Sequence, residues 1–110
     1  MGMRKILRIV NAKRQELAEI RWTEPGEVSV HADDAELKTS LTRLLADGRK
    51  NGIPLRGGSA REINGQTAYV ETVERIRPND ARFVEALSDV ISATRFRGER
   101  LFGLIKREEG

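Results

Sequence analysis

The chain has 110 residues, of which 20 are Lys or Arg and 17 are Asp or Glu, so its net charge is +3. This length predicts a single domain over residues 1–110, with a charged C-terminal tail from about residue 106. The absence of Cys and the presence of one His exclude disulfides, thiol nucleophiles and most transition-metal sites. No apolar run is long enough to span a membrane, and the N-terminus does not resemble a signal peptide. We therefore expect a soluble, cytoplasmic protein without a metal, a cofactor or a membrane partner.

The first third of the chain predicts strands. Residues 4–10 are rich in β-branched and aliphatic side chains, and residues 17–22 alternate apolar and charged ones, which favours a hairpin. A single helix over about 3–21 is the alternative, because the same segment also places apolar residues on one helical face. The Pro-Gly pair in residues 23–26 predicts a type II turn, and alternation in residues 28–32 predicts a further strand with its histidine facing outward.

A helix is predicted over residues 34–47. Asp33, followed by Glu36 three residues later, forms a start similar to a capping box, and Gly48 is placed to cap the C-terminus. The apolar residues of this helix recur at the spacing of one helical face, and they are Leu37, Leu41, Leu44 and Leu45.

The middle of the chain is less regular. Residues 49–61 contain Gly, Pro and basic residues without a lasting period, which predicts a loop or short segments joined by turns. The Asn64-Gly65 pair then indicates a second hairpin, because both central residues of a type I′ turn need a positive φ. Imperfect alternation in the outgoing strand, residues 67–76, predicts a bulge or burial on both faces.

The last third predicts a helix over residues 79–94, capped by Asn79 or Asp80, and a short final strand over residues 100–105. Two amphipathic helices and several strands joined by hairpins indicate an α+β fold. We expect a mainly antiparallel sheet with both helices packed on one face.

The sequence contains no recognisable catalytic motif. His31 precedes Asp33 and Asp34 at the junction of a strand and a helix, where catalytic groups or a metal could sit. Two acids before a helix are also what capping requires, and one His with two adjacent carboxylates does not define a metal geometry. No serine lies in a Gly-x-Ser-x-Gly context, and no glycine-rich segment has a phosphate-loop pattern. We therefore expect a protein that is not an enzyme.

Two basic clusters carry the nucleic-acid hypothesis. Both would contact phosphates and give binding that weakens steeply with salt, provided that they share one face. Phe96, between two bases of the second cluster, could stack on a nucleic-acid base. The seven residues are Arg49, Lys50, Arg56 and Arg61 in the first cluster, and Arg95, Arg97 and Arg100 in the second.

The leading hypothesis is a small non-enzymatic binding or protein-interaction module. The apolar run Leu101–Ile105 either completes the sheet or leaves an edge that pairs with another chain, so we expect a protein partner or a homo-oligomer. The alternative is the nucleic-acid or phosphate-binding domain that uses the two basic clusters.

Overall fold

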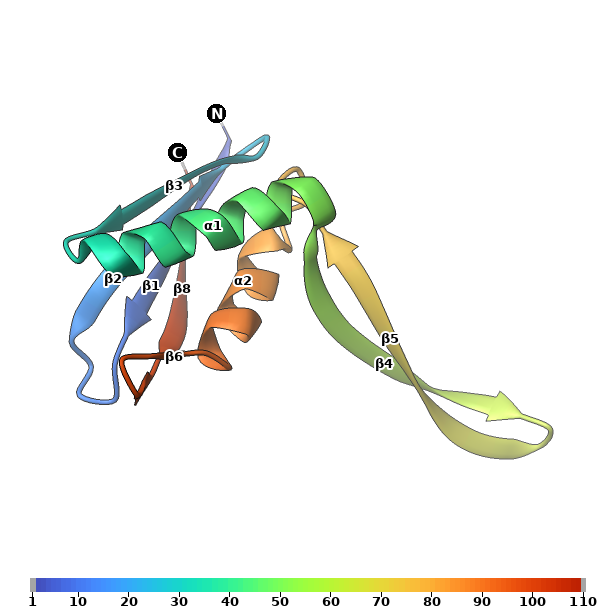
Figure 1. Ribbon diagram of the computed structural model, residues 1–110. Helices are drawn as coiled ribbons and strands as arrows, with labels where there is room; N and C mark the ends of the chain where they lie inside the picture. Colours follow the sequence, from blue (N-terminus) through green and yellow to red (C-terminus); the bar gives the residue numbers. More distant parts are fainter. Residues whose placement is uncertain (1, 110) are drawn as a thin grey trace.

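The computed structural model describes residues 2–109 and contains a four-stranded antiparallel sheet with two helices on one face (Figure 1). The strand order is β3-β2-β1-β8, and the central pair is the N-terminal hairpin. The sheet strands are β1 (Met3–Val10), β2 (Glu16–Thr23), β3 (Glu27–Ala32) and β8 (Phe102–Glu109). The predicted α+β class and the antiparallel sheet are confirmed.

The N-terminal segment forms the predicted hairpin rather than the alternative helix. Leu7 pairs with Ile20 and Ile9 pairs with Ala18, and all four side chains are buried on the face that the helices cover. The Asn11 side chain shapes the turn, because its Oδ1 accepts the N–H groups of residues 13 and 15, each at 3.0 Å. Period-2 burial of apolar residues therefore decides this segment.

The turn over residues 23–26 differs from the type II prediction. Its closing hydrogen bond runs from the Gly26 N–H to the Thr23 carbonyl at 2.9 Å, and the Glu24–Pro25 peptide is cis. Pro25 thus occupies the third position of the turn instead of the second.

Helix α1 (Ala35–Asn51) covers β3. The predicted cap Asp33 is wrong by one residue, because Asp34 Oδ1 accepts the N–H groups of residues 36 and 37. Gly48 is not the C-terminal cap either. It lies inside the helix, where a Cβ would approach Ile53 and Phe83 to 3.0 Å, and Gly52 with φ 79° ends the helix instead.

The predicted loop over residues 49–61 is wrong. Residues 49–51 complete α1, and a strand follows directly as β4 (Ile53–Ile63), which pairs with β5 (Gln66–Ile76). We call this hairpin, residues 53–76, the arm, because it projects far from the sheet and helices (Figure 1). The arm explains a radius of gyration of 15.9 Å, which exceeds the value of about 13 Å for a compact chain of this length.

Helix α2 (Phe83–Ser92) packs against β8 and β1. It is shorter than the predicted 79–94, and its N-cap residue Arg82 makes no side-chain cap. A short hairpin then leads into β8, and its two strands, β6 (Arg95–Phe96) and β7 (Glu99–Arg100), have two residues each. The strand β8 starts two residues later than predicted and continues through 106–109, where the charged tail was expected. No helix within residues 2–109 is long and apolar enough to cross a membrane.

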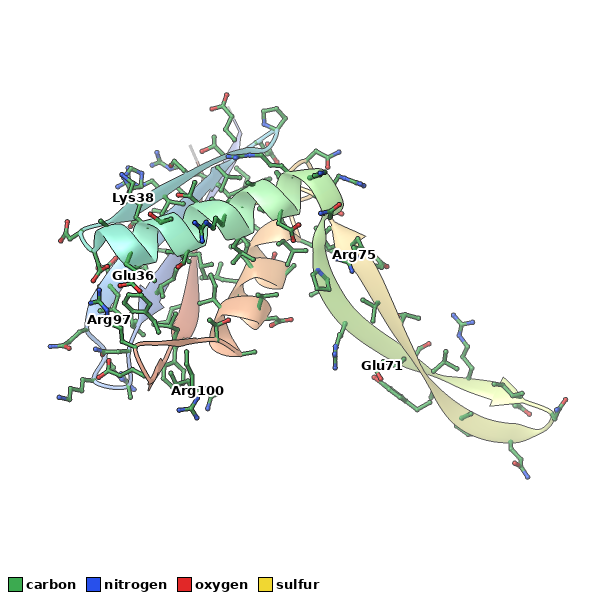
Figure 2. The ribbon with its side chains drawn as sticks, viewed as in Figure 1. Glu36, Lys38, Glu71, Arg75, Arg97 and Arg100 are labelled. Atoms are coloured by element: carbon green, nitrogen blue, oxygen red, sulfur yellow. The ribbon has the colours of Figure 1, made fainter. Side chains whose placement is uncertain are left out.

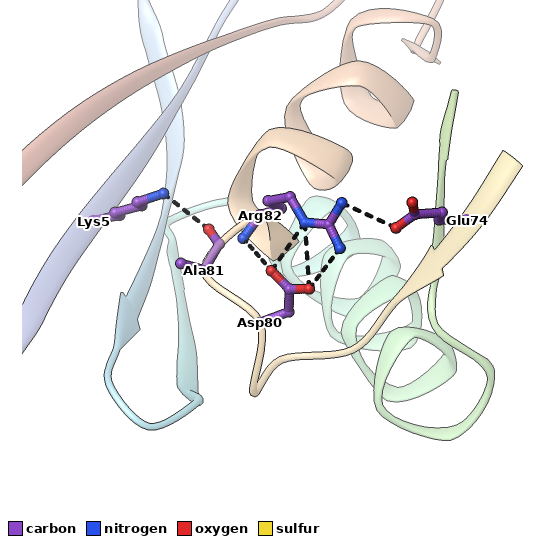
Figure 3. Close-up of polar contacts among 5 residues, drawn as sticks. All are labelled: Lys5, Glu74, Asp80, Ala81 and Arg82. Carbon is purple, nitrogen blue, oxygen red and sulfur yellow. Dashed lines mark hydrogen bonds and ion pairs between the residues drawn. The ribbon is translucent and has the colours of Figure 1, made fainter. Parts of the chain in front are cut away.

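The segment between the arm and α2 is fastened to the sheet by two side chains that sequence reasoning did not single out. The Trp22 ring nitrogen donates to the Pro78 carbonyl at 2.7 Å. The Lys5 ammonium donates to the Ala81 carbonyl at 2.8 Å, as Figure 3 shows. Lys5 is only 3% exposed and also pairs with Glu85 of α2 at 3.0 Å. These contacts fix the position from which the arm projects.

Candidate interaction surfaces

The arm is an uninterrupted antiparallel ribbon. Each strand has 11 residues, and the pairing runs without a break from Ile53–Ile76 at the base to Ile63–Gln66 at the tip. The predicted Asn64-Gly65 turn is confirmed, because both residues have positive φ, 52° and 77°. The predicted bulge or two-sided burial in β5 is wrong, since the register is regular and most of the strand is exposed.

The base of the arm is anchored in the core and by an ion-pair network. Ile53 and Ile76 are buried, and the Arg82 guanidinium bridges Glu74 of the arm and Asp80, each at 2.9 Å (Figure 3). Hydrogen bonds from the Arg82 side chain, and then from its N–H, lower the pKa of Asp80. The hydrogen bond from Arg82 to Asp80 is the main cause that raises the pKa of Arg82, and the hydrogen bond to Glu74 is the second. The arm therefore begins from a fixed position.

One face of the arm is exposed along its whole length. Alternate residues of paired strands share a face, so the register defines the members of this exposed arm face. Tyr69 and Val73 are its large apolar members, at 72% and 57% exposure. The Tyr69 ring reaches diagonally over Gly58, where an added Cβ would collide with the phenol. The exposed arm face comprises Pro54, Arg56, Gly58, Ala60, Glu62, Thr67, Tyr69, Glu71, Val73 and Arg75.

The arm carries balanced charge. Residues 53–76 contain three Arg and three Glu, which leaves no net charge. Arg56 lies 4.0 Å from Glu71, and Glu74 is paired with Arg82. Two of the predicted phosphate-binding residues, Arg56 and Arg61, are thus on a neutral ribbon rather than in a basic loop.

The other predicted basic residues are spread over the molecule. Arg49 and Lys50 lie at the C-terminal end of α1, where Arg49 donates to the Val28 carbonyl at 3.2 Å. At the opposite end of α1, Arg97 pairs with Asp34 at 2.7 Å and Glu36 at 2.9 Å (Figure 2). The two clusters therefore do not form one continuous stripe.

Arg97 is occupied by the acids that begin α1. Hydrogen bonding to Glu36 raises its pKa, and the N–H of residue 37 is the main cause that lowers the pKa of Asp34. Arg97 also lies 4.7 Å from the Phe96 ring, which is partly buried against the core. The ring that could have stacked on a nucleic-acid base is thus partly buried and in contact with Arg97.

One cleft does bring members of the two clusters together. It has a volume of about 860 Å³ and lies between the base of the arm and the C-terminal end of α2. Arg56 and Arg100 both line it, together with Val73 and Asp89. Arg100 is engaged by the chain itself, because it donates to the Ser92 carbonyl at 3.4 Å and stacks 4.9 Å from Phe102. Arg95 donates to the Gly98 carbonyl at 3.4 Å.

The terminal strand β8 forms a sheet edge, but α2 covers part of it. Ser92 accepts the Gly103 N–H at 3.2 Å, and Ser88 donates to the Gly103 carbonyl at 3.3 Å. A Cβ at Gly103 would approach Ser88 Oγ to 2.7 Å, so the strand and helix are in close contact. Leu104 and Ile105, at 53% and 40% exposure, lie beyond this blocked point. A strand added to this edge would meet α2 at Gly103.

The contacts of His31 and of the two aspartates that follow it are surface contacts and a helix cap. Its ring lies 3.2 Å from Ser29, Asp34 caps α1, and Asp33 lines a shallow surface hollow with His31. Within the described residues, no group of three His, Asp or Glu side chains could hold a metal ion. Residues 2–109 therefore supply no further side chain that would complete a metal site around His31.

No protein-family model matches the chain, and no curated protein or solved structure is significantly similar to it. Function is therefore inferred from the surfaces of the chain alone.

Proposed function

We propose that this protein is a non-enzymatic protein-interaction module and that the arm is its binding element. The exposed arm face carries this proposal. An isolated two-stranded hairpin is marginally stable in water, yet this one projects with a full face, including Tyr69 and Val73, open to solvent. Apolar and aromatic side chains grouped on an exposed surface are typical of binding sites. A partner packed on this face would supply the layer that the ribbon lacks.

The charge of the arm favours a protein partner over a nucleic acid. Phosphate binding requires an excess of Lys and Arg on the contacting element, whereas the arm has equal numbers of Arg and Glu. Arg97, the centre of the second basic cluster, is paired with two acids. The nucleic-acid hypothesis remains testable by a salt series, because several phosphate contacts would make binding to DNA or RNA fall steeply with salt.

Site-specific photo-cross-linking in cells tests the proposal. A photoreactive residue replaces Val73 on the exposed arm face, and a second variant carries it at Lys38, an exposed position of α1, as the matched control. We expect a protein adduct that resists nuclease from position 73 and a much weaker one from position 38. Equal yields at both positions, or an adduct that nuclease removes, would contradict a protein-binding arm.

A further inference from the structure

The outer edge of β5 carries unpaired backbone groups. The two-residue turn at the tip makes its flanking residues, Ile63 and Gln66, a hydrogen-bonded pair. Hydrogen-bonded and non-hydrogen-bonded pairs alternate along an antiparallel ladder, so every second residue from position 67 onward turns its N–H and C=O away from β4. Within residues 2–109, no other backbone group or side chain forms a hydrogen bond with the outward groups of residues 67, 69, 71 and 73. This edge therefore offers a row of donors and acceptors in the spacing of a β-ladder.

The edge of β5 lacks the features that usually protect an edge strand. Natural edges are blunted by proline, lysine, a bulge or a short strand, whereas β5 has 11 residues in regular register without Pro, Gly or Lys. The edge of β4 is less suited to pairing, because Pro54 has no N–H and Gly57 and Gly58 weaken the strand. Helix α2 also packs against β4, and β5 lies on the side of the arm away from α2 at the base (Figure 1). Of the two edges, β5 is thus the one open to a further strand.

The side chains beside this edge define what a further strand must carry. Tyr69 and Val73 lie on either side of Glu71 on the exposed arm face. The Glu71 carboxylate is 60% exposed, and Arg56 stands 4.0 Å from it, so it can accept a second cation. Residues directly opposite on an added strand would contact these three side chains in turn. The complementary strand therefore has the pattern apolar, any residue, basic, any residue, apolar.

Resting on the proposed function, we infer that the partner of the arm contributes an extended segment that pairs antiparallel with β5 as a third strand, with its Lys or Arg opposite Glu71. Main-chain hydrogen bonds provide the attachment in this mode of recognition, and alternate side chains provide the specificity. A third strand also stabilises the arm itself, because a two-stranded ribbon alone is marginal in water. A second copy of β5 does not have the required pattern, since an acid stands between its Tyr69 and Val73.

A synthetic peptide tests the pairing. The probe is the heptapeptide Ser-Val-Ser-Lys-Ser-Val-Ser with both ends blocked, which has the inferred pattern and small side chains elsewhere. It is added, up to about 1 mM, to the isotope-labelled full chain, and the backbone amide protons are followed by NMR. We expect downfield shifts at residues 69, 71 and 73, because their N–H groups gain an acceptor. Residues 68, 70 and 72 already bond to β4 and should change little.

Two isomers of the probe are matched controls for the hydrogen bonds. N-methylation of the two valine amides removes donors that would face β5, whereas N-methylation of the two inner serine amides removes donors on the far edge of the peptide. We expect about a tenfold loss of affinity for the first isomer and no loss for the second.

A charge exchange tests the register. Glu71→Lys should bind the original probe about two- to fivefold less tightly, and a probe with Glu in place of Lys correspondingly more tightly. Glu62→Lys is the control in the chain, because Glu62 lies on β4 and should leave both affinities unchanged.

Absence of shifts at 69, 71 and 73, equal shifts along the edge of β4, or equal losses for the two methylated probes would overturn the inference. Shifts that grow with chain concentration without any peptide would identify a second copy as the added strand and overturn the stated partner. The two proposals fail separately. A chain that ignores the peptide but still gives a protein adduct from position 73 in cells refutes only the strand pairing, whereas a chain that responds to the peptide but gives no adduct refutes the proposed function.

Discussion

Removal of most of the arm should leave the rest of the protein folded. Leu55 pairs with Glu74, and Ile63 pairs with Gln66 next to the natural Asn-Gly turn. The two pairs lie an even number of positions apart along the strands, so they have the same hydrogen-bonding pattern. Replacing residues 56–73 by Asn-Gly therefore closes a shorter hairpin with the same hydrogen-bonding geometry. The buried residues Ile53 and Ile76 remain, as does the Glu74–Arg82 ion pair.

The expected change in the free energy of unfolding is small. No residue between 56 and 73 belongs to the buried core. Loop length contributes only about 0.6 kcal/mol for each doubling, and shortening a connection acts in the stabilising direction. The removed part is a two-stranded ribbon without a second layer, and such a ribbon is at most marginally stable in water, because its cross-strand contacts are offset by the entropy of ordering its residues. We therefore expect the net change to stay within about 1 kcal/mol.

Urea unfolding followed by Trp22 fluorescence measures this change. Trp22 is the only tryptophan and is 1% exposed, so its emission reports the opening of the core. A loss of more than about 3 kcal/mol would show that the arm belongs to the cooperative core, and it would refute the division into a folded body and a projecting arm.

Further predictions concern the four-stranded sheet, the helices and the segment between the arm and α2. Leu87→Ala removes a fully buried side chain of α2 and should destabilise by about 2–5 kcal/mol in the same urea assay, whereas a loss below 1 kcal/mol would contradict its place in the core. Lys5→Met keeps the apolar stem but leaves the partly buried Ala81 carbonyl without its donor, so a loss of about 1–3 kcal/mol is expected, and an equally stable variant would argue against that bond. The pKa of Asp80 is lowered in the folded state, so its carboxylate stabilises the fold at neutral pH and this contribution disappears as the pH falls below the ordinary value of 3.8. The stability difference between the original chain and Asp80→Asn should accordingly shrink between pH 6 and pH 2, and a constant difference would exclude this linkage. Gly103→Ala should lower the melting temperature, because its Cβ would meet Ser88, and an unchanged value would contradict the close contact of β8 with α2.

The sequence was sufficient for elements whose apolar residues have one clear period. Alternation predicted β2 and β3, and the leucine spacing predicted α1, because burial of one face governs both patterns. The density of β-branched and aliphatic residues predicted β1. Helix ends were less accurate. Asp33 and Asp34 are equally good caps by residue type, and only the chain path shows that Asp34 reaches the free N–H groups.

The first strand of the arm was missed because it buries almost nothing. A strand exposed along most of its length has no reason to alternate apolar and polar residues, so residues 53–63 gave no periodic signal. Gly57 and Gly58 also weaken strand propensity, but the Tyr69 ring covers Gly58 from the opposite strand. The available signal was the Asn64-Gly65 turn, because extending its register backward pairs β4 with β5 residue by residue.

The nucleic-acid hypothesis depended on whether two basic clusters share a face, which a linear sequence does not specify. In the folded chain, Arg97 is paired at one end of α1 and Arg49 lies at the other, while Arg56 and Arg61 extend along the arm. Buried Lys5 was not singled out either, because its partners Ala81 and Glu85 are distant in the chain.

The most direct test of the arm as a protein-binding element is a photo-cross-linking scan along β5, one position at a time from residue 67 to residue 73. Binding through one face of a ribbon predicts high yields at 67, 69, 71 and 73 and low yields at 68, 70 and 72, because successive side chains point to opposite faces. Uniform yields along the strand, or no protein adduct at any position, would contradict the account.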